Sequence, residues 1–223
     1  MAEVAPLFPL GTVLLPGLPL PLHVFEERYR RLVVDLLALP HDARRFGVVA
    51  IRAGRETGPV APELYDVGCV AGVREIAERA DGRYHLTTTG EDRFRLLDVD
   101  TSRPYLRGRV QRLGEPVGDD PDLARRLARA VAAALREYLP ELRRLHVGAT
   151  GLARLPVEPV PLSYVAAAAV VVDLPDRQRL LAADDATARL RDVLGLLHRE
   201  TALLRLLSAP AAPDLARGLV SPN

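Results

Sequence analysis

In the first half of the chain, apolar residues alternate with other residues along short segments, the pattern of half-buried β-strands. The first such segment covers residues 18–25, where leucine and valine alternate mainly with proline and histidine. Proline has no backbone N–H, so alternation and proline together predict an edge or rim strand of a barrel, with one face on the core. Further strands are expected at 46–51, 65–76, 83–89, 92–99 and 105–113.

Turn residues indicate how some of these strands connect. Asp81 and Gly82 precede the strand at 83–89 and predict a hairpin. Gly90 and Glu91 are expected to join that strand to the next one, at 92–99. In the strand at 105–113, the alternation predicts that Leu106, Gly108 and Val110 face inward. The segment at 52–64 contains turn residues without periodicity and is long enough to be functional.

One helix is expected within the strand-rich half. Its apolar residues recur at spacings of three and four, as in an amphipathic helix that ends before Pro40. They are Phe25, Tyr29, Leu32, Val33 and Leu36.

After residues 114–122 the apolar period changes from two to that of a helix. Asp120 and Pro121 are expected as N-cap and first helical residue of a helix that ends at Pro140. Helices at 163–173, capped by Ser163, at 176–183 and at 185–208 follow.

The change of period predicts an α+β protein with two parts. A β-barrel subdomain with one helix is expected at 1–113, and a helical bundle subdomain at 114–208. Residues 209–223 are expected to form a flexible tail.

Charge and composition exclude several classes of function. The net charge is +1 over 223 residues, which provides no general attraction to nucleic acid or acidic lipid. Only 4% of residues are aromatic, which leaves few platforms for stacking bases. No lysine occurs among the 30 basic residues, so a Schiff-base amine, a P-loop lysine and a Ser-Lys dyad are all excluded.

No arrangement of residues predicts catalysis. The single cysteine, Cys69, is interpreted as a small buried hydrophobe, and no serine lies in a G-x-S-x-G motif. The five histidines are scattered without the spacing of metal ligands. We therefore expect no catalytic residues, no metal, no cofactor and no enzymatic activity.

The same sequence favours a soluble protein. Its N-terminus lacks the basic leader of a signal peptide. Its longest apolar run, at 164–172, is far shorter than the roughly 20 residues of a membrane span. A cytoplasmic location and no contact with a membrane are expected.

The opening run "PLFPLGTVLLPGLPLPLHVFEERYRRLV" resembles the start of the N-terminal substrate-binding domain of Lon proteases. That family has a "PLFPL" strand, a "PG" turn, an "LPL" strand and an "F-E-x-R-Y" helix start in this order. "YDVGCVAGVREI", "DGRYHLTTTGEDRFRLLDV" and "YLRGRVQRL" are similar to later strands of the family. The helical half agrees more loosely, through Gln178, Leu180, Leu181, Arg189 and Leu190.

The resemblance implies a PUA-like β-barrel followed by a helical bundle, in a module that holds unfolded polypeptide for a protease. No ATPase or Ser-Lys protease domain follows in this sequence, so a stand-alone, non-catalytic form is expected. Most leucines of the opening run, and Arg28, Tyr29 and Arg93, are expected to hold the fold; the alternative is that they form a binding surface.

The predicted function is polypeptide binding, in an adaptor or chaperone-like protein that acts in protein quality control, with a separate ATPase or protease as a further partner. Two alternatives stay open: a structural homodimer, and an RNA-binding PUA-like protein, which the charge disfavours. The expected contact surface is the barrel rim with the 52–64 segment, facing a groove beside the helices. Its candidate residues are Leu18, His23, Arg52, Arg55, Pro59, Leu64 and Tyr65.

Overall fold

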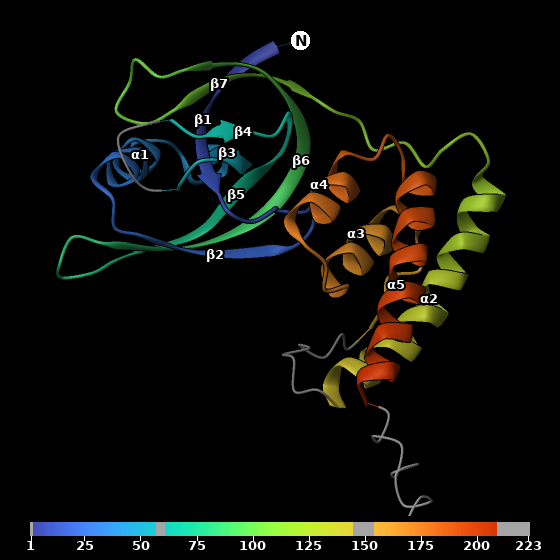
Figure 1. The fold of residues 1–223 in the computed structure, drawn as a ribbon. Coiled ribbons are helices and arrows are strands. Elements are labelled where there is room, and N and C mark those ends of the chain that lie inside the picture. The colour runs from blue at the N-terminus through green and yellow to red at the C-terminus, as the bar shows by residue number, and fades with distance from the viewer. Residues whose placement is uncertain (1, 57–60, 145–153, 209–223) are drawn as a thin grey trace, which may run out of the picture.

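Strands occupy the first half of the protein and helices the second, apart from one helix packed at the barrel (Figure 1). The structure is a computed structural model that describes residues 2–56, 61–144 and 154–208. The strands are β1 (Ala2–Leu10), β2 (Pro19–Val24), β3 (Arg45–Ala53), β4 (Glu63–Leu64), β5 (Val67–Glu78), β6 (Tyr84–Asp100) and β7 (Arg107–Arg112). The helices are α1 (Glu27–Leu37), α2 (Pro121–Arg144), α3 (Pro159–Ala169), α4 (Leu174–Ala182) and α5 (Ala186–Ser208), with a short 3-10 turn at His41–Ala43.

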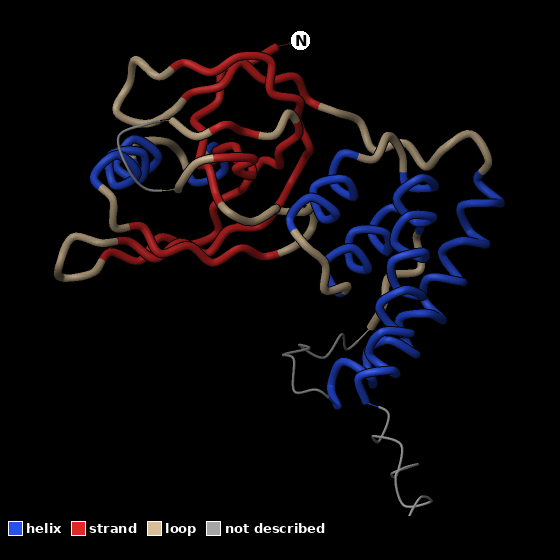
Figure 2. Tube along the Cα trace, viewed as in Figure 1, coloured by secondary structure: helices blue, strands red, loops and turns tan. Residues whose placement is uncertain are grey.

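The sheet closes on itself. Its strand order is β1-β7-β6-β5-β3-β4, and β1 also pairs with β3 in parallel, so that β1, β7, β6, β5 and β3 form a closed barrel. Figure 2 shows the ring of strands beside the separate group of helices. The barrel followed by helices agrees with the predicted fold class. As expected of an edge strand, β2 pairs with a single one of the strands that the structure describes, β6.

The strand β6 differs from the prediction, because the segments expected as two strands are one continuous strand. Gly90 does not make a turn. Its N–H donates to the carbonyl of Leu18, and its own carbonyl accepts from the N–H of Gly17. A Cβ at Gly90 would collide with the backbone oxygen of Leu15. Glycine is therefore needed here because the preceding β1–β2 connection crosses β6 at close range.

The hairpin predicted at Asp81-Gly82 is present between β5 and β6. Gly82 has a φ of +74°, in the left-handed region, and the Arg83 N–H donates to the Asp81 carboxylate at 3.1 Å. The predicted inward residues of β7 are also buried: Leu106, just before the strand, is 7% exposed and Val110 is fully buried.

The first helix begins later than predicted, because Phe25 is not part of it. The N-cap of α1 is Glu26, and Phe25 lies outside the helix with 53% of its surface exposed. An apolar residue just before the N-cap is often buried by packing on an apolar residue at the fourth helical position. That position holds Arg30, so Phe25 has no such partner.

The helix α2 was predicted to end at Pro140, but it continues to Arg144. Proline inside a helix removes the hydrogen bond that its N–H would donate, and its ring crowds the carbonyl four residues earlier. Beyond it, Leu142 is only 4% exposed, and Glu141 accepts from Arg144 at 2.7 Å. Packing of this last turn therefore outweighs the lost hydrogen bond.

The helix α3 was predicted to begin at Ser163, but it begins at Pro159 with Glu158 as N-cap. Ser163 is fully buried within the helix, and its hydroxyl donates to the carbonyl of Val160 at 2.7 Å. Proline at the first helical position was the sequence signal for this start. The predicted cap at Asp120 is confirmed, since its carboxylate accepts from the N–H of Leu123 at 2.9 Å.

The barrel and the helices share one hydrophobic core. Buried residues of the barrel, such as Val48 and Cys69, belong to the same cluster as Leu135 of α2 and Leu197 of α5. Among the helices α2 to α5 in Figure 1, α4 lies nearest the barrel and α2 farthest from it. The division into subdomains near residue 113 stays a prediction, and the predicted tail at 209–223 lies outside the described residues.

Two glycine substitutions test the crossing at β6. We expect Gly90→Ala to lower the free energy of unfolding by about 2 kcal/mol, because the new methyl group meets backbone that has no room to move. Gly195→Ala in α5 is the control: nothing lies within 4 Å of its Cβ position, so it should stabilise by up to about 1 kcal/mol. Urea unfolding measures both. Equal effects of the two substitutions would contradict the crossing.

Candidate functional site

The residues predicted to bind a ligand lie at separate places. Arg52 and Arg55 are exposed, and Arg52 forms an ion pair with Glu63 at 3.2 Å. Leu64 is half-buried against a small cluster of residues from the barrel strands, whereas Leu18 and Tyr65 are half-buried against the main core. Pro59 lies outside the described residues.

The segment between β3 and β5 contacts two different parts of the molecule. The Glu56 carboxylate accepts from the N–H of Gly11, and its carbonyl accepts from the Arg28 guanidinium of α1 at 2.5 Å. At the other end, Tyr65 leads into Val67, whose carbonyl accepts from Gln178 of α4 at 2.8 Å. Of the described part of this segment, only the Tyr65 end approaches the bundle.

His23, the remaining predicted residue, lies on the wall of a shallow pocket of about 80 Å³ between β1, β2 and the start of α1. We call this the rim pocket. Its floor is a stacked aromatic pair, Phe8 and Tyr29, whose ring centroids are 4.1 Å apart. Leu22 lines its wall, and Phe25 stands exposed at its mouth. Burial raises the pKa of Tyr29 to about 12, so its hydroxyl stays uncharged at neutral pH.

The outer edge of β2 beside the rim pocket is poor in hydrogen-bond donors. The Gly90 N–H donates to the carbonyl of Leu18, so Leu18 and every second residue after it point their backbone groups toward β6. Pro19, Pro21 and His23 point theirs outward, and of these only His23 has an N–H. An incoming strand would therefore find acceptors without donors, which favours recognition of side chains over strand addition.

The sequence pattern does not predict that Phe25 is exposed. Its spacing of four residues from Tyr29 places Phe25 on the buried apolar face of the predicted helix. The signal that separates the buried from the exposed position is the charged Arg30 at the fourth helical position, where a buried Phe25 would need an apolar partner.

A second and larger cleft, of about 770 Å³, lies between α1 and the connection from β6 to β7. We call it the arginine cleft, because four of its lining residues are arginines. It is lined by Glu27, Arg28, Arg31 and Asp35 of α1, and by Arg103, Pro104, Tyr105 and Arg107. No sequence motif predicted it, since its two walls are about 70 residues apart, as the hydrogen bond from Tyr105 to Asp35 shows.

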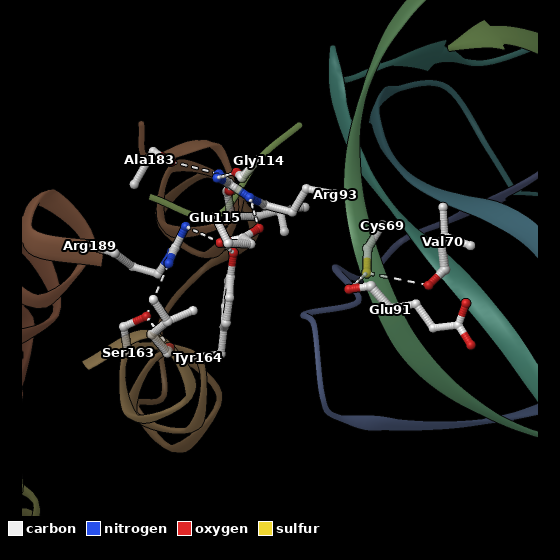
Figure 3. A network of polar contacts seen from close by, with 12 residues as sticks. Cys69, Val70, Glu91, Arg93, Gly114, Glu115, Ser163, Tyr164, Ala183 and Arg189 are labelled. Carbon is white, nitrogen blue, oxygen red and sulfur yellow. Dashed lines mark hydrogen bonds and ion pairs between the residues drawn. The ribbon is translucent and has the colours of Figure 1, made fainter. Parts of the chain in front are cut away.

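A buried polar network joins the barrel to the helices (Figure 3). Arg93 of β6 is 2% exposed, and its Nε lies 2.5 Å from Oε1 of Glu115. Its terminal nitrogens donate to the carbonyls of Leu181 and Ala183 at 2.7 and 2.6 Å, and to that of Gly114 at 3.0 Å. The carbonyls at the end of α4 have no partners within the helix, so Arg93 satisfies groups that would otherwise be buried unpaired.

Arg189 of α5 completes this network from the opposite side. It is fully buried, donates to the carbonyl of Leu180 at 2.9 Å, and lies 3.9 Å above the ring of Tyr164. The Tyr164 hydroxyl in turn donates to Glu115 at 2.5 Å. Burial is the main cause that lowers the pKa of Arg189 and raises that of Tyr164. One terminal nitrogen of Arg189 has no hydrogen-bond partner among the described residues and lies 3.6 Å from Glu115. The network is buried and its members bond to one another, as predicted for Arg93, so we assign it to holding the fold.

Cys69 lies on the face of β5 that packs toward the helices, opposite Arg93 of β6, and has no exposed surface. Burial raises the pKa of its thiol well above the usual range, which lowers the thiolate fraction and hence its reactivity. Among the described residues, no group of three potential metal ligands converges, and no helix is long and apolar enough to cross a membrane.

Comparison with known proteins identifies the family. Residues 4–199 match the family model of the ATP-dependent protease La (LON) substrate-binding domain. The chain belongs to the LON substrate-binding domain family. It is 32% identical over 205 residues to the Lon protease of Anaeromyxobacter dehalogenans and 30% identical to Lon protease 2 of Myxococcus xanthus. The match covers 91% and 92% of this chain but only 24% of each relative.

Solved structures of the LON substrate-binding family have the same fold. The crystal structure of a Lon N-terminal domain protein from Xanthomonas campestris superposes with a TM-score of 0.61 at 27% identity, covering 86% of this chain and 98% of that one. The N-terminal domain of Mycobacterium avium complex Lon protease superposes with a TM-score of 0.60 at 19% identity. The region that matches these relatives is the substrate-binding domain. The family model is named for binding and not for a catalysed reaction.

The buried network predicts a large cost for removing Arg93. Arg93→Ala should lower the free energy of unfolding by about 3 kcal/mol, because Glu115 and the carbonyls at the end of α4 lose their partner. Arg95→Ala, two residues along the same strand and exposed, should change it by less than about 0.5 kcal/mol. Chemical denaturation measures both. A cost for Arg93→Ala as small as that of the control would show that the network does not hold the bundle.

Cys69 should be unreactive in the folded protein. Because burial raises the thiol pKa and blocks access, iodoacetamide at neutral pH should label Cys69 only after addition of denaturant. Mass spectrometry of the native and denatured samples checks this. Rapid labelling of the native protein would contradict the buried position.

Proposed function

We propose that this protein is a polypeptide-binding module that captures apolar side chains of unfolded segments at the rim pocket. The observation that carries the proposal is Phe25, a large aromatic residue that is 53% exposed beside a pocket lined mainly by apolar residues, together with His23, Glu26 and Glu56. Membership of the LON substrate-binding domain family supports the class of ligand.

The chemistry of the rim pocket suits such a ligand. An unfolded segment presents apolar side chains that folded proteins bury, and the pocket offers aromatic and leucine side chains to receive them. Burial of one apolar side chain contributes about 1.5–3 kcal/mol. A single pocket of this size therefore supports weak and reversible binding, as a holder of many different clients requires.

We further propose that the module acts as an adaptor or chaperone-like holder, which presents polypeptide to a separate ATPase or protease. The relatives that match this chain are Lon proteases, and the matched region is about a quarter of their length. The partner would then supply the chemistry that follows capture.

A second candidate function, a structural homodimer, is favoured by one observation. At the end of α5, Leu203, Leu206 and Leu207 are 47%, 73% and 74% exposed. A second copy packed on these leucines would bury them. Because this contact lies on a helix that takes no part in the rim pocket, a dimer could also bind peptide, so sedimentation and peptide binding must be measured together to separate the two candidates.

The test is binding of fluorescent, unfolded peptides of neutral charge that differ only in apolar content, measured alongside sedimentation of the free protein. We expect micromolar affinity for apolar peptides and none for a glycine-serine peptide. A tight dimer with no affinity for any peptide would replace the proposal with the homodimer.

Substitution at the rim pocket tests the location. Phe25→Glu should weaken binding of the apolar peptide at least about tenfold, because it removes an aromatic contact and puts a charge at the mouth of the pocket. Leu97→Glu, on β6 and 41% exposed, is the matched control and should leave the affinity unchanged. Equal effects of the two substitutions would place the binding surface elsewhere.

A further inference from the structure

The arginine cleft carries more positive charge than its own carboxylates balance. Glu27 pairs with Arg30, outside the cleft, at 3.0 Å. Asp35 pairs with Arg31 at 3.2 Å and accepts a hydrogen bond from the Tyr105 hydroxyl at 2.8 Å. Both acidic residues of the cleft are thus engaged.

Two arginines on the opposite wall have no such partner. No ion pair or side-chain hydrogen bond joins Arg103 or Arg107 to another residue of the described chain, and the Nε of Arg107 is buried without an acceptor. Asp100 lies near both arginines and its negative charge interacts with both, but no ion pair joins it to either one, and its carboxylate accepts from the N–H of Ser102 at 2.8 Å. The positive charge of a guanidinium that has no ion pair within the protein is available to attract an anionic ligand.

We propose that the arginine cleft binds an acidic segment of the polypeptide whose apolar side chain occupies the rim pocket. This inference rests on the proposed function and adds a preference for the sequence of the client. The two sites share the start of α1: Glu26 and Tyr29 line the rim pocket, and Glu27, Arg28 and Arg31 line the arginine cleft. Carboxylates next to an apolar anchor would meet Arg103 and Arg107.

The lining of the cleft favours polypeptide over RNA. A phosphodiester chain carries a charge at every nucleotide and would be repelled by Glu27 and Asp35, whereas a polypeptide can place acidic side chains only where the arginines are. RNA recognition also uses aromatic platforms for bases. The one aromatic residue lining the cleft is Tyr105, and its hydroxyl is held by Asp35.

The experiment compares three unfolded peptides with the same apolar core and flanks of glutamate, glutamine or lysine. At low salt, we expect the unsubstituted protein to bind the glutamate peptide at least about fivefold more tightly than the glutamine peptide, as two or more exposed ion pairs allow. The preference should fall as salt is added. Equal affinity for the glutamate and glutamine peptides, or no binding of the glutamate peptide, would overturn the inference.

Charge reversal locates the preference. The double variant Arg103→Glu, Arg107→Glu should lose the glutamate preference and bind the lysine peptide more tightly, which a merely unfolded variant would not do. Arg109→Glu is the matched control, since Arg109 is exposed on β7 outside the cleft, and it should keep the preference. Retention of the preference in the double variant would overturn the inference.

Two further results separate this inference from the proposed function and from the nucleic-acid alternative. Binding of the glutamine peptide, lost in Phe25→Glu, tests the rim pocket alone and stands even if the cleft shows no preference. A uridine oligonucleotide that binds more tightly than the glutamate peptide, and is released in the double variant, would overturn the inference in favour of RNA.

Discussion

The arrangement of the molecule depends on two buried arginines that meet at the end of one short helix. Arg93 comes from the barrel and Arg189 from the last helix, and both donate to carbonyls at the end of α4. Glu115, in the connection between the two halves, lies 2.5 Å from one guanidinium and 3.6 Å from the other. The helices can therefore pack on the barrel only where these charges are satisfied, which fixes one orientation of the bundle.

That orientation leaves the opposite side of the barrel free of the helices α2 to α5. Figure 1 shows α1 on the side of the barrel away from α4 and α5. Both surfaces that we propose for binding are built around α1, so neither is buried by the bundle. The helix itself is held by its apolar face: Tyr29, Leu32 and Leu36 are almost fully buried. A rigid helix with an apolar pocket on one side and a positively charged cleft on the other suits a ligand of mixed composition.

The prolines of β2 serve both stability and binding. At Pro19 and Pro21 the backbone points away from β6, so proline costs the ladder no hydrogen bond. The same positions remove donors from the exposed edge, which protects it from pairing with stray strands. An exposed apolar pocket beside an unprotected edge would invite aggregation, and the prolines allow the pocket to be exposed without that cost.

The local sequence pattern was sufficient to predict many of the helices and strands and to indicate the family. The alternation in β2 and β7, the Asp81-Gly82 hairpin and the Asp120 cap follow from contacts within a few residues, and the sequence alone predicts them. The opening motif by itself also indicated the LON substrate-binding family. Family membership, however, named no residue that touches a ligand, and the residues predicted for that role lie at several separate places.

Only the tertiary structure decided the remainder, because it depends on residues far apart in the chain. From the sequence alone, Gly90 is predicted to form a turn, and only the structure shows that the backbone at Leu15 crosses it. In the same way, Pro140 is predicted to end its helix, and only the structure shows that Leu142 beyond it is buried. Ser163 is predicted from the sequence to cap a helix, whereas in the structure its hydroxyl accepts a hydrogen bond from Arg189 at 3.0 Å. The arginine cleft joins side chains about 70 residues apart, so no periodicity within a short window contains it.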